Sequence, residues 1–262
     1  MRARGASVSW PDYILAGSVG ALVLIAWWTL WLWGRSPAAH LLMHGSAHLG
    51  PAGIDLWYYA GIFVLGWTLM SIAMMLPTVV PLLVLFRRVV AGRSNQVLLV
   101  SLVVGGYLAV WIAFGICGQW MNRLLVRVWW KIPWIAASPW ITSAAILAVA
   151  GLYQFSRIKY ACLEKCRTPL SFIVSRWRGG FEPLQALRIG MDHGAFCVGC
   201  CWSLMLLMFL VGAGSLGWMF LLGVVMALEK NSPWGRKTSA PIGGLLLSAA
   251  AIVFYLGMFR GD

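Results

Sequence analysis

Long apolar segments alternate with short polar connections along this chain, and the pattern predicts a polytopic bundle of transmembrane helices. A helix needs about 20 consecutive apolar residues to span lipid, where every backbone amide must be hydrogen-bonded internally. About seven segments meet this criterion, and the sixth is short. They are residues 13–33, 57–85, 97–118, 138–155, 194–211, 215–228 and 241–259. The fold class is therefore expected to be all-α, with residues 1–262 forming a single domain.

The fifth and sixth segments allow a second interpretation. Residues 194–228 contain no charged side chain, and a glycine-rich stretch at 212–217 divides them. They are two full spans or a re-entrant pair, and either arrangement returns the chain to the side it came from. Gly190 lies just before the fifth segment and Gly194 begins it. These two small residues are four apart, a small-xxx-small pattern that predicts close contact with another helix.

The composition supports a location in the membrane and excludes a soluble domain. Hydrophobic residues make up 61% of the chain, charged residues only 10%, and the mean hydropathy is +0.83. A soluble globular domain carries about 25% charged residues. We therefore expect a multi-pass protein of a bacterial inner (cytoplasmic) membrane, with the lipid bilayer as its main partner.

Basic residues are distributed unequally between the two sides of this topology. With the N-terminus in the cytoplasm, most Lys and Arg residues fall in cytoplasmic connections, as the positive-inside rule requires. The net charge of +13 is then a topology signal, and no nucleic-acid partner is expected because no soluble basic domain is present. The C-terminus is predicted to lie outside.

The outer connection, residues 34–56, contains three histidines at intervals of four. On a short helix at the membrane surface, His40, His44 and His48 would share one face, where two imidazoles can bind one metal ion. The alternative is a helix that lies in the membrane interface and whose polar face consists of histidines without a metal-binding role. Gly45 in its centre weakens the helix prediction.

The cytoplasmic connection, residues 156–189, is the most basic part of the chain. It is predicted to begin as a continuation of the fourth helix and to stop at Pro169. Cys162 and Cys166 are four residues apart and would share a face of that helix. Because the cytoplasm keeps thiols reduced, structural disulfides are not expected here.

Soft metal ligands gather where the fifth segment enters the membrane, in GMDHGAFCVGCCWSLMLLM (190–208). His193, Cys197 and Cys201 recur every four residues, Cys200 falls on the same broad face, and Met205 continues it toward the bilayer centre. Thiolates and thioethers favour Cu(I), whereas thiolate with imidazole also suits zinc. The alternative is that these cysteines are small apolar packing residues.

Three further residues extend this candidate site. Asp192 adjoins His193 and is suited to orient a ligand imidazole. Glu229 ends the sixth segment, where an acid at membrane depth suggests function; it would otherwise reach the headgroups or pair with Lys230. Met74 shares a face with Met70 just before Pro77, so it is a candidate copper ligand, although methionine also serves as core filling.

The chain resembles the bacterial family of predicted metal-binding integral membrane proteins catalogued as domain of unknown function 2182. The resemblance rests on MSIAMMLPTVVP (70–81), GYLAVW (106–111), AGLYQFSRIKYACLEKCRTPL (150–170), HGAFCVGCCWSLM (193–205) and the Glu–Lys pair at 229–230. Members are described as metal-binding and sometimes as copper chaperones. The resemblance implies ligand roles for His193, Cys162, Cys166, Cys197, Cys200 and Cys201. It does not include the outer histidines.

These patterns lead to one expected function and two alternatives. The chain is expected to bind Cu(I) at the cytoplasmic end of the fifth helix and to store it or deliver it to a membrane metalloenzyme. One alternative is a thiol-disulfide oxidoreductase, in which Cys197 and a neighbour exchange electrons with Cys162 and Cys166. The other is a structural subunit of a larger membrane complex. No constellation typical of an enzyme active site is present in the sequence.

Overall fold

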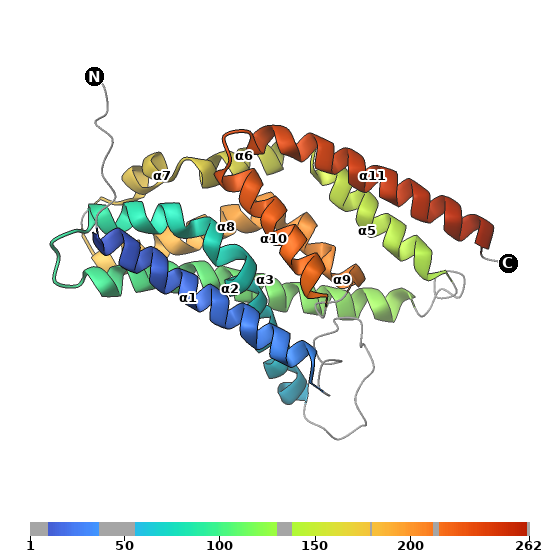
Figure 1. The fold of residues 1–262 in the computed structure, drawn as a ribbon, viewed down its shortest axis with the longest axis horizontal. Helices are drawn as coiled ribbons and strands as arrows, with labels where there is room; N and C mark the ends of the chain where they lie inside the picture. The colour runs from blue at the N-terminus through green and yellow to red at the C-terminus, as the bar shows by residue number, and fades with distance from the viewer. Residues whose placement is uncertain (1–9, 37–55, 130–137, 179, 212–214, 261–262) are drawn as a thin grey trace.

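The computed structural model describes residues 10–36, 56–129, 138–178, 180–211 and 215–260, and the regular structure within these ranges is helical throughout. Figure 1 shows an elongated bundle in which α5 and α11 lie side by side. The helices in chain order are α1 (Trp10–Gly34), α2 (Leu56–Val89), α3 (Gln96–Trp129), α5 (Pro139–Tyr153), α6 (Arg157–Arg167), α7 (Pro169–Arg176), α8 (Glu182–Leu206), α9 (Met208–Val211), α10 (Leu216–Asn231) and α11 (Gly235–Arg260).

Within the described ranges, five helices are long and apolar enough to cross a membrane: α1, α2, α3, α8 and α11. This agrees with a membrane protein. The α10 helix has 16 residues and falls short of this length, as its short apolar segment already indicated. The number of spans and the side on which each terminus lies stay predictions.

The fourth predicted helix does not continue straight into the cytoplasmic connection, and that expectation was wrong. The chain breaks after Tyr153, and the axes of α5 and α6 differ by 61°. Ser156 starts α6 because its hydroxyl accepts a hydrogen bond from the Ile158 amide at 3.1 Å. As predicted, α6 ends before Pro169.

The α8 helix begins at Glu182, well before the apolar segment that starts at residue 194. Its first turns carry polar side chains that face ionic partners on other elements: Glu182 pairs with Arg93, and Asp192 pairs with Arg176 at 2.6 Å. A search for uninterrupted apolar sequence does not include these turns. The helix therefore extends beyond the apolar segment toward the basic connections.

The closest helix contact joins α3 and α8, and glycines make it possible. A Cβ atom at Gly190 would overlap the carbonyl oxygen of Val103, and one at Gly106 would overlap that of Leu187. A Cβ at Gly194 would lie 3.0 Å from that of Val110. The predicted small-residue contact is thus confirmed, and it brings the backbone of α8 directly against α3.

Ion pairs and hydrogen bonds of arginine side chains join helix ends and connections that were predicted to lie on the cytoplasmic side. The carboxylate of Asp12, which is 1% exposed at the start of α1, accepts hydrogen bonds from Arg87 and Arg88 at the end of α2. Arg167 of α6 donates to the carbonyl oxygens of Glu229 and Pro233 at 2.8 and 3.2 Å. These contacts bring together segments that are far apart in the sequence.

The glycine contact between α3 and α8 provides a stability test. Gly190→Ala is expected to lower the thermal unfolding midpoint of the detergent-purified protein, because overpacking costs about 1–3 kcal/mol. Gly105→Ala is the matched control, since a Cβ there meets nothing within 4 Å. Equal midpoints for the two variants would show that the backbones of α3 and α8 are not in close contact.

Candidate metal centre

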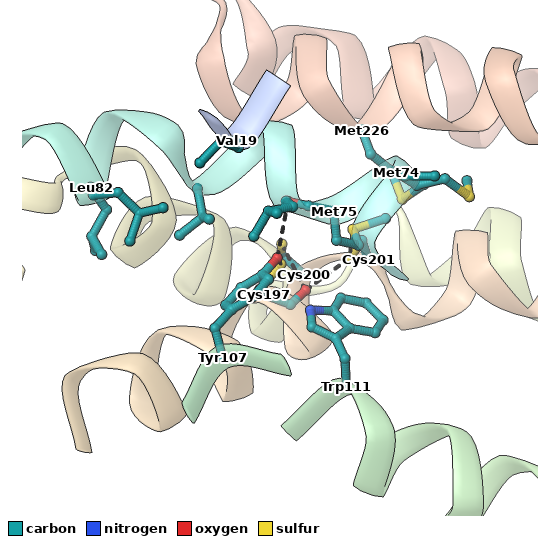
Figure 2. Packing of buried hydrophobic residues seen from close by; sticks show 14 of the residues in the cluster. Val19, Met74, Met75, Leu82, Tyr107, Trp111, Cys197, Cys200, Cys201 and Met226 are labelled. Atoms are coloured by element: carbon teal, nitrogen blue, oxygen red, sulfur yellow. Dashed lines mark hydrogen bonds between the residues drawn. The ribbon is translucent and has the colours of Figure 1, made fainter. Parts of the chain in front are cut away.

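The three cysteines of α8 lie in the centre of the bundle. Cys197, Cys200 and Cys201 are each 1% exposed, and side chains from α2, α3 and α10 surround them. Figure 2 shows these cysteines between Met75 of α2 and Tyr107 of α3. The predicted face of α8 is therefore turned away from lipid and toward the protein interior.

The ammonium of Lys230 lies among these sulfur atoms. Its Nζ is 2.7 Å from Sγ of Cys197 and 3.7 Å from Sγ of Cys201. The thioether sulfur of Met75 is also 3.7 Å from Nζ, and the hydroxyl oxygen of Thr78 is 3.4 Å away. Two thiols and a thioether from α2 and α8 thus surround one cation contributed by α10.

The hydroxyl of Tyr107 links α3 to the same cluster. Its oxygen lies 3.0 Å from Sγ of Cys197 and 3.2 Å from the carbonyl oxygen of Met75. The tyrosine therefore fixes Cys197 against α2 as well as against α3.

Backbone hydrogen bonds orient the other two thiols of α8. Cys200 and Cys201 both donate to the carbonyl oxygen of Cys197, with S···O distances of 3.1 and 2.9 Å. Sγ of Cys201 is also 4.0 Å from the sulfur of Met75. These bonds hold Cys201 on the side that faces Lys230.

The cysteines of α6 contact the same turn of α8 from another direction. Sγ of Cys162 packs directly on Gly199, where a Cβ atom would approach it to 2.6 Å. The Cys166 side chain packs against the buried core cluster to which Cys200 belongs. Both α6 cysteines are more exposed than those of α8. The two predicted cysteine groups are therefore neighbours in the fold.

His193 and Asp192 lie one turn from the cluster but face different surroundings. The His193 ring is 3% exposed and packs against the rings of Phe172 and Tyr107, with centroid distances of 5.4 and 6.1 Å. Within the described residues its Nδ1 has no hydrogen-bond partner. Asp192 is directed to Arg176 on α7. The buried, unpaired imidazole nitrogen remains available to a ligand.

Glu229 does not pair with its neighbour Lys230. Both carboxylate oxygens accept hydrogen bonds at 2.8 Å from Lys159, which is fully buried in α6. Ser239 of α11 donates to the same carboxylate at 2.7 Å, and Gln154 also contacts the lysine. The acid at membrane depth thus joins α6, α10 and α11 and does not belong to the sulfur cluster.

The methionines expected to surround the site are buried in the core. Met74 is 2% exposed, and Met205 is fully buried. Figure 2 shows Met226 of α10 beside Met74. Further buried methionines are Met70, Met75, Met208 and Met219. These side chains are therefore part of the packed core, which agrees with core filling, and their role as copper ligands stays a prediction. The histidines His40, His44 and His48 lie outside the described residues.

Sequence reasoning missed two central residues, Lys230 and Tyr107. The signal for Lys230 was available, because a lysine at membrane depth is costly unless it is paired. Its neighbour Glu229 appeared to supply that partner. Tyr107 gave no such signal, since tyrosine is common in membrane helices and its hydrogen-bond partners come from other helices.

The chemistry of the donors determines which ion they suit. Within the part of the chain that the structure describes, no three His, Cys, Asp or Glu side chains converge as a metal site. The convergent set is two thiols and one thioether, Cys197, Cys201 and Met75, and such soft sulfur donors favour Cu(I) over harder cations. The residues therefore fit a copper ion by donor type.

Comparison with known proteins assigns a family to most of the chain. The model of the PpoB2 family, described as a copper chaperone, matches residues 64–253. This range includes α8, α6, α10 and the part of α2 that contributes Met75. No curated protein and no solved structure matches the chain. The expected link to metals is supported as a link to copper, whereas the identification with domain of unknown function 2182 stays a prediction.

The buried ion pair beside the cluster generates a test of its structural role. Glu229→Gln is expected to destabilise the protein by about 3–5 kcal/mol, because it leaves the Lys159 ammonium buried without its counter-ion. Glu164→Gln, on the exposed side of α6, is the matched control. Thermal unfolding in detergent measures both variants, and an unchanged midpoint for Glu229→Gln would contradict the buried pair.

Proposed function

We propose a function from the premise that the chain belongs to the PpoB2 copper chaperone family: it is a membrane protein that binds Cu(I) and passes it to a copper-using partner. Family membership associates the chain with copper handling. The particular ion, the binding residues and the nature of the partner are the proposal.

The buried group of sulfur atoms around a cation is the observation that carries this proposal. Cys197, Cys201 and Met75 come from two helices and converge on the ammonium of Lys230. Sulfur atoms that surround a positive charge in the protein interior have the arrangement that a soft cation requires. Thiolates bind Cu(I) strongly, and a thioether adds a weaker bond that is readily exchanged.

The difference in exposure between the cysteines of α6 and those of α8 suggests the order in which they bind Cu(I) during transfer. Cys162 and Cys166 are more exposed than the α8 cysteines and pack against the buried core, with Cys162 directly on Gly199. We assign them the exchange of Cu(I) between the cytoplasmic surface and the buried site. His193, whose Nδ1 is unpaired, is suited to the same entry step.

The buried methionines provide a second direction of transfer. Met74, Met226 and Met205 are buried in the core, and thioethers hold Cu(I) loosely enough to release it. In this proposal the ion leaves through them toward a partner metalloenzyme in or beside the same membrane. The membrane is the bacterial inner membrane, with the N-terminus in the cytoplasm.

The burial of the cysteines favours ion binding over thiol-disulfide exchange. Exchange with a partner protein requires an attacking thiolate that the partner can reach. Cys197, Cys200 and Cys201 are each 1% exposed, so another protein's disulfide has no access to them. A small ion can enter such a site through side-chain motion alone.

Loss of the two thiols nearest Lys230 tests the proposal. The double variant Cys197→Ser with Cys201→Ser is expected to lose nearly all copper that co-purifies with the wild-type protein under anaerobic conditions, since hydroxyls are poor Cu(I) ligands. Elemental analysis of the purified protein gives the copper stoichiometry. Cys117→Ser is the matched control, because Cys117 is exposed on α3.

Two results would overturn this assignment. One is a wild-type protein that binds no Cu(I) when it is added in the reduced form. The other is a double variant that retains the wild-type stoichiometry while the Cys117→Ser control behaves normally. A normal thermal unfolding midpoint for the double variant establishes that lost copper reflects lost ligands and not a lost fold.

A further inference from the structure

Lys230 is a buried cation whose contacts differ from those of every other buried basic residue described. Lys159, the other buried lysine among the described residues, pairs with the Glu229 carboxylate. The Lys230 side chain is 5% exposed, and in the described structure it forms no ion pair with a carboxylate. Its Nζ contacts two thiols, one thioether and one hydroxyl.

An ammonium in such a site requires compensation. Burying a charge without a partner is costly, and a neighbouring carboxylate usually supplies the opposite charge. Here the adjacent Glu229 is already paired with Lys159 and Ser239. The group closest to the ammonium is Cys197, whose sulfur is 2.7 Å away.

We infer that Lys230 is the specificity-determining residue of the sulfur site: its ammonium holds the position of the cargo ion, and Cu(I) binds by displacing it. This inference rests on the proposed function and adds a selection rule to it. One monovalent cation replaces another, so the charge of the buried site does not change. A divalent ion such as zinc adds a positive charge where the dielectric is low, which is unfavourable.

The exchange is balanced without a redox step. The contact between the ammonium and the Cys197 thiolate breaks, and copper bonds form to this thiolate, to the Met75 thioether and to the neutral Cys201 thiol, which keeps its proton. The ammonium leaves with all of its protons, and copper stays in its reduced state. The reverse exchange releases the ion, because the returning ammonium competes with it for the same sulfur atoms.

The end of α10 gives the displaced side chain a place to move. Lys230 is the penultimate residue of α10, which ends at Asn231, and the exposed Lys237 follows shortly after on α11. A lysine has a long, flexible stem and commonly extends its charged end to the membrane surface. Rotation of the side chain alone therefore takes the ammonium from the sulfur site toward water.

Metal titration of a charge-removing variant tests the inference. We compare the full-length detergent-purified wild-type protein, Lys230→Leu and the control Lys237→Leu. Cu(I) affinity is measured by competition with a chromophoric Cu(I) chelator, and Zn(II) affinity by competition with a zinc indicator. Leucine is chosen because it is apolar and unable to bind metal.

The Lys230→Leu substitution is expected to change the affinities for Cu(I) and Zn(II) by different factors. Lys230→Leu should bind Cu(I) more tightly by about tenfold or more, because no internal cation competes, and its gain for Zn(II) should be larger still. Its preference for Cu(I) over Zn(II) therefore falls, while Lys237→Leu matches the wild type. Affinities of Lys230→Leu within about twofold of the wild type for both metals would overturn the inference.

Chemical labelling of the unmutated protein supplies an independent measurement that needs no variant to fold. A membrane-permeable amine-reactive reagent is applied with and without Cu(I), and peptide mass spectrometry quantifies modification of Lys230 and Lys237. Cu(I) should raise labelling of Lys230 several-fold and leave Lys237 unchanged. Equal labelling of Lys230 in both states would overturn the displacement.

These outcomes are separable from failure of the proposed function. If the wild-type protein binds no Cu(I), the function itself is wrong. If the wild-type protein binds Cu(I) while Lys230→Leu changes neither affinity nor selectivity, the function stands and the role of Lys230 is wrong.

Discussion

A charge buried in a low-dielectric interior must lie against an opposite charge or a strong hydrogen-bond acceptor, and two adjacent residues of α10 are subject to this constraint. Glu229 satisfies it through Lys159 and Ser239, whereas Lys230 satisfies it through Cys197. Because the two side chains leave α10 in different directions, the end of this helix is held between α6 and α11 on one side and α2 and α8 on the other.

The packing of α8 positions the cysteines that contact the Lys230 ammonium. Glycines at 190 and 194 allow its backbone to contact α3, which places the Tyr107 hydroxyl beside Cys197. Gly199 on the neighbouring turn admits Cys162 of α6 in the same way. Small residues thus permit two helices, α3 and α6, to approach α8 closely. The cysteines of α8 are consequently surrounded by protein.

Much of the helical architecture follows directly from the sequence. Apolar length predicts α1, α2, α3 and α11, and the soft-ligand face of α8 follows from the spacing of His193, Cys197 and Cys201. The sequence did not reveal the 61° bend after Tyr153, because the residues of α6 also have helical periodicity. The sequence also did not indicate that α8 starts at Glu182. The first turns of that helix are polar and are stabilised by ion pairs with Arg93 and Arg176, which belong to other elements.

By itself, the sequence determined which side chains share a helix face, because the geometry of one helix depends only on spacing. That is sufficient to group the cysteines of α8 and to indicate soft-metal chemistry. Only the tertiary structure decided which residues meet across helices: Lys230 with Cys197, Glu229 with Lys159, and Met75 with Cys201. The physical reason is that helix rotation and packing set these contacts, and an adjacent pair such as Glu229 and Lys230 points to different neighbours.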